Sequence, residues 1–179
     1  MRHPWNSFLS PAKLNLGLKI VGKRSDGYHL LNTIFCLINL FDEIQIQITN
    51  SEKISIIEHK QAWGYQKDLS YRAALLLQDF TSCKLGANIK VKKTIPSGSG
   101  LGGGSSNAAT VLVTLNQLWQ TGLTKQELIY LGGSLGADVP FFIHGKNAWA
   151  EGIGDNLTTI DIPEQYFVII CPSLHEVKS

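Results

Sequence analysis

The residues best suited to chemistry in this sequence lie in a glycine-rich stretch, residues 96–107, which runs directly into a helical pattern. Glycine reaches backbone conformations closed to other residues, and without a Cβ atom it lets a phosphate approach closely. Successive backbone amides there can point at one anion. Apolar residues recur at Ala108, Leu112, Leu115 and Trp119, so we expect residues 105–107 to form a first helical turn, which favours negative charge. The stretch therefore predicts a phosphate site formed by Pro96, Ser97, Gly98, Ser99, Gly100, Leu101, Gly102, Gly103, Gly104, Ser105 and Ser106.

Three common roles of glycine-rich segments, namely linker, dinucleotide loop and Walker motif, fit these residues less well. The G-x-G-x-x-G match at residues 98–103 is weak by itself, and a flexible linker would not lead at once into helical periodicity. A dinucleotide fold requires a second strand ending in an acidic residue about twenty residues later. Residues 121–127 instead indicate a turn and a helix start, and no Gly-Lys-Ser or Gly-Lys-Thr closes the loop as in a Walker motif. A third class of phosphate-binding loop is indicated.

Two charged residues outside the loop, Lys13 and Asp138, have ordinary structural interpretations when the pattern alone is considered. Residues 12–21 alternate between apolar and polar types, which predicts a strand with Lys13 and Asn15 side by side on its polar face. Periodicity alone favours a solvated face for these two residues and for Lys19. Asp138 lies in a predicted turn ahead of an apolar run at residues 141–143, which we expect to be a strand. Taken alone, Asp138 is best interpreted as a turn residue.

The remaining elements form a scaffold. Strands are predicted at residues 44–48, 54–57, 88–93 and 166–170, the last of them buried. A helix is predicted at residues 68–80, with Asp68 as N-cap and Leu69, Ala73, Leu76 and Phe80 as its apolar stripe. A second helix opens with a Thr124-x-x-Glu127 capping box and ends at Gly136, and Gly132 and Gly133 within it suggest a close backbone approach. The lysines of residues 88–93 suit a solvated face, with a phosphate contact as the alternative.

Composition excludes several classes of function. The 179 residues are 44% hydrophobic with a net charge of +2, which suits one enzyme domain with a real core and indicates neither nucleic acid nor a membrane as partner. The three cysteines are widely spaced and suit buried thiols in a reducing compartment, and the histidines suggest no zinc site. No apolar run is long enough to span a bilayer. We expect a cytoplasmic protein that acts on a small molecule, as a monomer or weak homodimer.

Four motifs in order, at residues 10–16 (SPAKLNL), 24–30 (RSDGYHL), 96–109 (PSGSGLGGGSSNAA) and 136–142 (GADVPFF), resemble the GHMP kinases, which are small-molecule kinases of the galactose, homoserine and mevalonate type. The resemblance extends over about residues 8–170 and implies a structural strand and tight turn at residues 148–154. It implies an α+β fold, namely the family's N-terminal ATP-binding domain, with βαβ elements like those of a ribosomal protein and a mixed sheet packed on helices.

The resemblance also implies the chemistry. ATP would be the phosphoryl donor at the glycine loop, Mg²⁺ is expected with it, and Lys13 and Asp138 would be the catalytic pair acting on a hydroxyl group. Asn15, Tyr28 and His29 would bind the substrate, with the last two at a cytidine group, in the non-mevalonate route to isoprenoids. Without the resemblance, aromatic packing against the Asp26-Gly27 turn accounts for Tyr28 and His29 equally well.

The sequence departs from the family pattern in a few places. The family's chains continue into a second α+β domain, so we expect residues 1–165 to be the ATP-binding domain and residues 166–179 to begin a truncated C-terminal domain. Asp68 stands where an Asn near adenine is expected, so we do not count it as a site residue; Ser97 and Asn107 replace the common Met and Asp. A kinase for another small alcohol and a non-catalytic ATP-binding module remain as alternatives.

Overall fold

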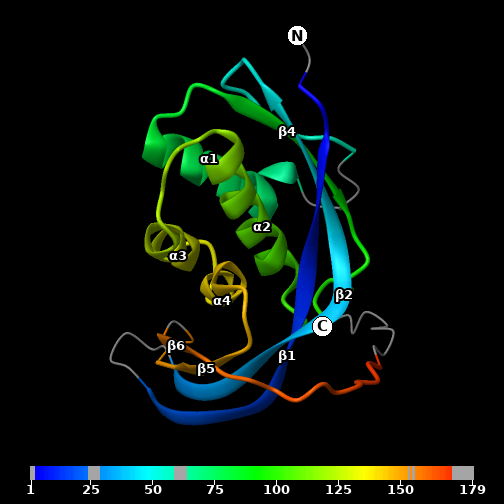
Figure 1. Ribbon diagram of the computed structural model, residues 1–179, viewed down its shortest axis with the longest axis vertical. Helices are drawn as coiled ribbons and strands as arrows, with labels where there is room; N and C mark the ends of the chain where they lie inside the picture. Colours follow the sequence, from blue (N-terminus) through cyan, green and yellow to red (C-terminus); the bar gives the residue numbers. More distant parts are fainter. Residues whose placement is uncertain (1–2, 24–28, 59–63, 153, 155, 171–179) are drawn as a thin grey trace, which may run out of the picture.

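The computed structural model describes residues 3–23, 29–58, 64–152, 154 and 156–170. It contains a six-stranded mixed sheet in the order β3-β4-β2-β5-β6, with β1 paired to β2. Helices α1 to α4 lie on one side of this sheet (Figure 1). The predicted α+β fold, with a mixed sheet packed on helices, is confirmed.

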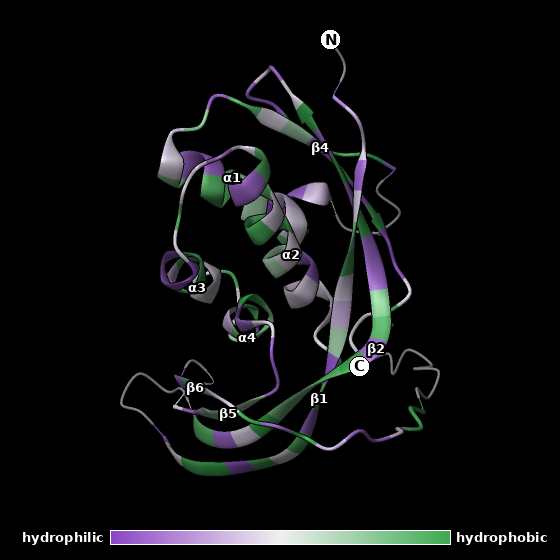
Figure 2. Cartoon of the chain, viewed as in Figure 1, coloured by the Kyte–Doolittle hydropathy of each residue, from purple (hydrophilic) through white to green (hydrophobic). Residues whose placement is uncertain are grey.

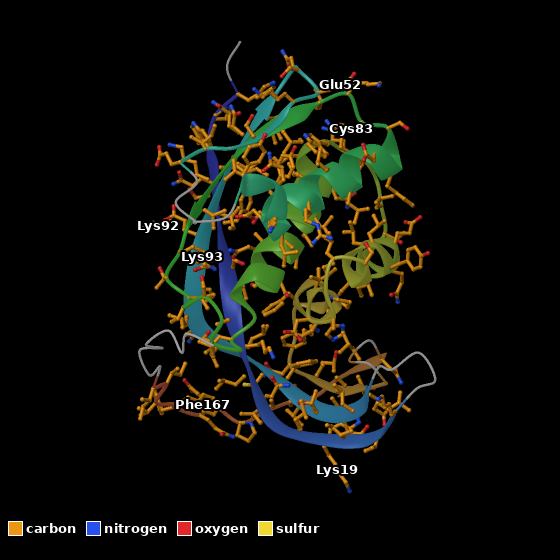
Figure 3. The ribbon with its side chains drawn as sticks, turned by 180° about the vertical axis from the view of Figure 1, so that it is seen from behind. Lys19, Glu52, Cys83, Lys92, Lys93 and Phe167 are labelled. Carbon is orange, nitrogen blue, oxygen red and sulfur yellow. The ribbon has the colours of Figure 1, made fainter. Side chains whose placement is uncertain are left out.

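A long antiparallel pair, β1 (Asn6–Lys23) and β2 (His29–Thr49), forms the backbone of the sheet. Figure 2 shows hydrophilic and hydrophobic residues alternating along both strands. The predicted strands at residues 12–21 and 44–48 lie within this pair. Burial along β1 differs from the expectation, because Lys13 on the polar face is buried whereas Leu18 and Ile20 are more than half exposed. Lys19 points into solvent, as predicted (Figure 3).

A βαβ unit follows, made of β3 (Ile54–Ile56), α1 (Leu69–Thr81) and β4 (Gly86–Lys92), with β3 and β4 parallel. A short 3-10 helix, η1 (Tyr65–Lys67), precedes α1. Asp68 caps α1 as predicted, since its side chain accepts a hydrogen bond from the Ser70 amide at 2.8 Å. The predicted apolar stripe is confirmed in part, because Ala73 is fully buried and Leu69 and Leu76 pack partly buried against the core. Phe80 was wrong, since it is 53% exposed, and the buried face is completed by Ser70, Ala74, Leu77 and Gln78.

Helix α2 (Gly103–Leu118) crosses the middle of the helical layer and supplies much of the core. Helix α3 (Lys125–Gly133) begins with the predicted Thr124 capping box. The close approach expected at Gly132 is confirmed, because a Cβ atom there would lie 2.7 Å from Ile143 Cδ1. The main core joins α1, α2, α3 and α4 to the sheet and includes Ile44, Ile46, Leu77, Ile89, Val111, Leu112, Leu115, Leu128, Leu131, Val139 and Ile143.

The strand expected at residues 141–143 is instead part of helix α4 (Val139–His144). A short apolar run does not distinguish strand from helix. Pro140 in the first turn and Gly145 just past the end, at φ +73°, are the flanking residues that favour a helix. Phe141 is fully buried and packs on Phe35, with ring centroids 4.7 Å apart.

Strands β5 (Ala148–Glu151) and β6 (Asn156–Thr159) complete the sheet, and β5 confirms the strand predicted there. The buried strand predicted at residues 166–170 was wrong, because this segment pairs with no strand of the described chain and Tyr166, Val168 and Ile170 are largely exposed. An apolar run becomes a strand only where a sheet edge accepts its backbone hydrogen bonds.

Two of the cysteines belong to the described residues, and both are free thiols. Cys36 is buried, and this burial raises the pKa of its thiol, whereas Cys83 is only partly buried. Cys171 lies outside the described residues. Within the described ranges, none of the helices has the length and hydrophobicity needed to cross a bilayer.

Candidate active site

The glycine loop connects β4 to α2, and its course depends on three left-handed residues. Gly98, Gly100 and Gly102 have φ values of +71°, +77° and +73°, which residues with a Cβ atom adopt only with strain. Gly102 is the N-cap of α2, so the last bend of the loop turns the chain directly into the helix. The Lys13 amide donates to the Leu101 carbonyl at 3.0 Å, which ties the loop to β1.

A cavity of about 670 Å³ opens over this loop. Its other walls come from the segment that joins η1 to α1, from Lys93 after β4 and from Asp138 before α4. The predicted loop residues that line it are Pro96, Ser97, Gly98, Ser99, Gly100, Gly102, Gly103, Gly104 and Ser105. The amino end of α2 faces a space large enough for a small ligand, and its free amides and dipole favour an anion there.

Two of the eleven predicted loop residues do not line the cavity. Leu101 is 5% exposed and packs in a small cluster with Ala12 and Ile95. Ser106 is fully buried and accepts a hydrogen bond from the Ser10 hydroxyl at 2.8 Å. Both residues hold the loop and the start of α2 against β1, which is a structural task.

Lys13 and Asp138 are 125 positions apart in the chain, and the fold brings Lys13 Nζ to 3.5 Å from Asp138 Oδ2. Asp138 lines the cavity, whereas Lys13 does not. The Lys13 side chain is buried, while that of Asp138 is 30% exposed. Lys13 Nζ also donates to Asn15 Oδ1 at 2.5 Å and lies 5.1 Å from the centroid of the Phe35 ring. The ammonium is thus held by its neighbours while the carboxylate stays accessible from the cavity.

Asn15 is fixed by a short chain of hydrogen bonds. Its Nδ2 donates to the Thr33 hydroxyl at 2.9 Å, and that hydroxyl donates to the Gly17 carbonyl at 2.6 Å. These contacts orient the Asn15 amide so that its oxygen faces Lys13. The side-by-side arrangement of Lys13 and Asn15 that the strand period predicted is therefore present.

The other predicted substrate residues lie outside what the structure describes. Tyr28 is not among the described residues, and His29 is described only as the first residue of β2, without its side chain. Among the described residues no group of three or more His, Cys, Asp or Glu side chains gathers where a metal ion could be held.

Two further residues of the cavity wall were not counted as site residues from the sequence, although a phosphate contact was the alternative for the lysines of residues 88–93. Lys93 lines the cavity and pairs with the fully buried Asp42. Asn107 also lines it and is 4% exposed, and within the described chain its Oδ1 has no hydrogen-bond partner. The position of Lys93 immediately before the loop was the available signal, but its burial was not visible in the sequence.

Comparison with known proteins identifies relatives of this chain. The profile described as "GHMP kinases N terminal domain" matches residues 68–146. A 4-diphosphocytidyl-2-C-methyl-D-erythritol kinase of Neisseria meningitidis serogroup A is 53% identical over 169 residues, covering 94% of this chain and 60% of the relative. The enzyme of the same name from Haemophilus ducreyi is also 53% identical, over 92% of this chain and 59% of its own length. The chain thus spans about 60% of the length of these relatives.

Solved structures agree with this comparison. A crystal structure of 4-(cytidine 5'-diphospho)-2C-methyl-D-erythritol kinase superposes with a TM-score of 0.77 at 39% identity, covering 88% of this chain and 56% of that one. The mevalonate kinase of Methanococcus jannaschii, at 16% identity and a TM-score of 0.62, shares the fold.

Proposed function

This chain belongs to the GHMP kinase family, and we propose from that premise that its cavity binds ATP for phosphoryl transfer to an alcohol. The observation that carries the proposal is that Asp138, which lines the cavity above the glycine loop, pairs with the buried Lys13, with 3.5 Å between carboxylate oxygen and ammonium nitrogen. The proposed acceptor is the 2-hydroxyl group of 4-diphosphocytidyl-2-C-methyl-D-erythritol, on the non-mevalonate route to isoprenoids.

The ATP phosphates would lie against the loop residues that line the cavity and the amino end of α2. Loop amides offer hydrogen bonds at fixed positions, and the helix dipole adds positive potential where the phosphates need it. Phosphoryl transfer depends mostly on position and on charge stabilisation, which such a cradle supplies. Leu101 and Ser106 would contribute by holding the cradle in shape.

Asp138 would act as general base and Lys13 as its electrostatic partner. The substrate hydroxyl oxygen attacks the γ-phosphorus, its proton passes to Asp138, and the bond from phosphorus to the bridging oxygen of ADP breaks. The Lys13 ammonium lowers the cost of negative charge on the oxygens around phosphorus. Asn15 fixes this ammonium through its own hydrogen bond.

The oxygen donors at the cavity fit Mg²⁺, which prefers a carboxylate together with phosphate oxygens and water. The Ser105 hydroxyl, which lines the cavity, would lie beside it, and phosphate oxygens and water would supply most of its ligands. Bound there, Mg²⁺ would neutralise phosphate charge. A site with few protein ligands is usual for this ion.

The cytidine end of the substrate is proposed to bind at Tyr28 and His29. An aromatic face stacks on a pyrimidine, and an imidazole or phenol group reads its polar edge. We further propose that residues 1–165 form the ATP-binding domain and that residues 166–179 begin a second domain. The extended, exposed course of residues 160–170 supports that division.

The test is product identification by phosphorus NMR after incubation with ATP, Mg²⁺ and 4-diphosphocytidyl-2-C-methyl-D-erythritol. The chain is assayed alone and joined to the C-terminal remainder of the Neisseria meningitidis relative. We expect ADP and a phosphate monoester in equal amounts in the joined protein. Turnover of mevalonate or homoserine instead would favour a kinase for another alcohol, and ATP binding without turnover of any of these would favour a non-catalytic module.

A further inference from the structure

Asp42 is a fully buried carboxylate on β2, at the point where β2 and β4 separate. The ladder between these strands ends with the pair Glu43 and Lys92, so the next amides along the chain lose their strand partner. Asp42 replaces it: its Oδ1 accepts from the amides of Thr94 at 2.7 Å and Ile95 at 2.8 Å. Its Oδ2 forms an ion pair with Lys93 Nζ.

The segment that Asp42 holds touches the start of α2. A Cβ atom on Gly103, the first residue of that helix, would lie 2.9 Å from Ile95 Cγ2 and 3.0 Å from Lys93 Nζ. Ile95 also packs with Leu101 inside the glycine loop. The position of the loop and that of the Lys93 ammonium at the cavity wall therefore both depend on one carboxylate.

Stability alone does not account for this arrangement. Burying a carboxylate is costly, and a buried ion pair is often no more stabilising than apolar residues of the same size. A buried pair does fix its partners in one geometry, because both oxygens of Asp42 are engaged in defined directions. This property matters beside a cavity whose ligand needs a preformed cradle.

We propose that Asp42 is a positioning residue for nucleotide binding, holding the Lys93 ammonium and the lead-in to the glycine loop in their binding geometry. The inference rests on the proposed binding of ATP at this loop. Asp42 does not line the cavity and acts through the residues that it holds.

Substitutions separate the two interactions of Asp42, which are the hydrogen bonds to the backbone amides and the ion pair with Lys93. Asp42→Asn retains a carbonyl oxygen for the Thr94 and Ile95 amides but turns an amide donor toward Lys93, so it removes the charge pairing. Lys93→Met removes the ammonium and leaves the backbone hydrogen bonds, and Lys93→Arg restores the charge. The matched controls are Glu43→Gln and Lys92→Met, because this neighbouring pair has an N–O distance of 3.7 Å and a 79% exposed lysine. Figure 3 shows Lys92 and Lys93 close together at the end of β4.

The readouts are the dissociation constant for ATP, by isothermal titration well below the melting temperature, and the melting temperature itself. We expect Asp42→Asn and Lys93→Met each to weaken ATP binding about tenfold, the effect of one charge-assisted contact, and Lys93→Arg to recover most of it. In the Lys93→Met background, Asp42→Asn should weaken binding no further. Both control variants should bind ATP as the unsubstituted chain does.

Two results would overturn the inference separately from the proposed function. If the unsubstituted chain binds ATP and Asp42→Asn lowers the melting temperature without changing the dissociation constant, Asp42 is only a structural residue. If Lys93→Met binds ATP with unchanged affinity, the ammonium is not what Asp42 positions. Failure of the unsubstituted chain to bind ATP would instead contradict the proposed function, and this inference with it.

Discussion

Replacing Gly102 by Ala tests how the glycine loop, Lys13 and α4 fit together. Gly102 has a φ of +73°, and a Cβ atom there would lie 2.8 Å from two ring carbons of Phe142 and 3.1 Å from Lys13 Cγ. Gly122 is the matched control, because its φ is +74° and nothing lies within 4 Å of its Cβ position. The two substitutions therefore share the backbone strain and differ in the steric clash.

The expected magnitudes follow from that difference. A left-handed conformation costs a residue with a Cβ atom about 1–2 kcal/mol, which should be the whole effect of Gly122→Ala on the free energy of unfolding. Gly102→Ala adds overpacking against Phe142 and Lys13, typically about another 1–3 kcal/mol. Because the clash pushes on the ammonium beside the cavity, ATP affinity should also fall, by about tenfold or more.

Urea unfolding measures the free energy of unfolding of both variants, and titration measures their affinity for ATP. We expect Gly102→Ala to lose more stability than Gly122→Ala and to lose ATP affinity, whereas Gly122→Ala should bind ATP normally. Equal destabilisation of the two variants, with ATP affinity unchanged in both, would show that Gly102 does not make this contact and would refute the reasoning.

Two further predictions concern pH and packing. Burial, followed by the charges of Lys125 and Lys146, lowers the pKa of His144 below its ordinary value near 6.5, so the unfolded chain binds the proton more readily. Stability should thus fall as the pH drops from about 6.5 toward the folded pKa. His144→Gln should flatten this part of the stability profile, measured by urea unfolding between about pH 7.5 and 5. An unchanged slope in that variant would contradict the prediction. Gly132→Ala should destabilise the protein by about 1–3 kcal/mol, because its Cβ atom would meet Ile143 and Val139. Gly133→Ala, whose Cβ atom would meet only Pro140 at 3.9 Å, should leave stability unchanged or raise it by up to about 1 kcal/mol. Thermal melting of the pair measures the difference, and equal melting temperatures would count against the close helix contact.

Local patterns predicted most elements because they act over short distances. The Thr124 capping box and the Asp68 cap are properties of neighbouring residues, and the structure contains both. Residues 12–21 form a strand as predicted, although their burial does not alternate. Predictions failed where tertiary contacts decide. Residues 166–170, for example, have no strand partner in the described chain. The error at residues 141–143 has a local cause instead, because the neighbouring Pro140 and Gly145 favour a helix where the apolar run alone is ambiguous.

The candidate site was likewise predicted only in those parts that local patterns determine. The motifs indicated the glycine loop and the candidates Lys13 and Asp138, but only the fold brings the last two within 3.5 Å. Asp42 was not predictable, because a lone carboxylate in a strand is usually solvated and nothing in its neighbours shows that the ladder ends there. Leu101 and Ser106 lie inside the motif, yet their side chains pack inward, which a motif cannot indicate.

The most direct test of the central proposal compares two carboxylates at the same cavity, Asp138 and Asp68. Steady-state turnover of 4-diphosphocytidyl-2-C-methyl-D-erythritol is measured for Asp138→Asn and Asp68→Asn. Both variants are made in this chain fused to the C-terminal remainder of the Neisseria meningitidis relative. Asn preserves the helix cap at position 68, so that variant should keep turnover within a few-fold. Loss of the general base should lower kcat about 10²–10⁴-fold in Asp138→Asn. Full turnover by Asp138→Asn would contradict its role as the base.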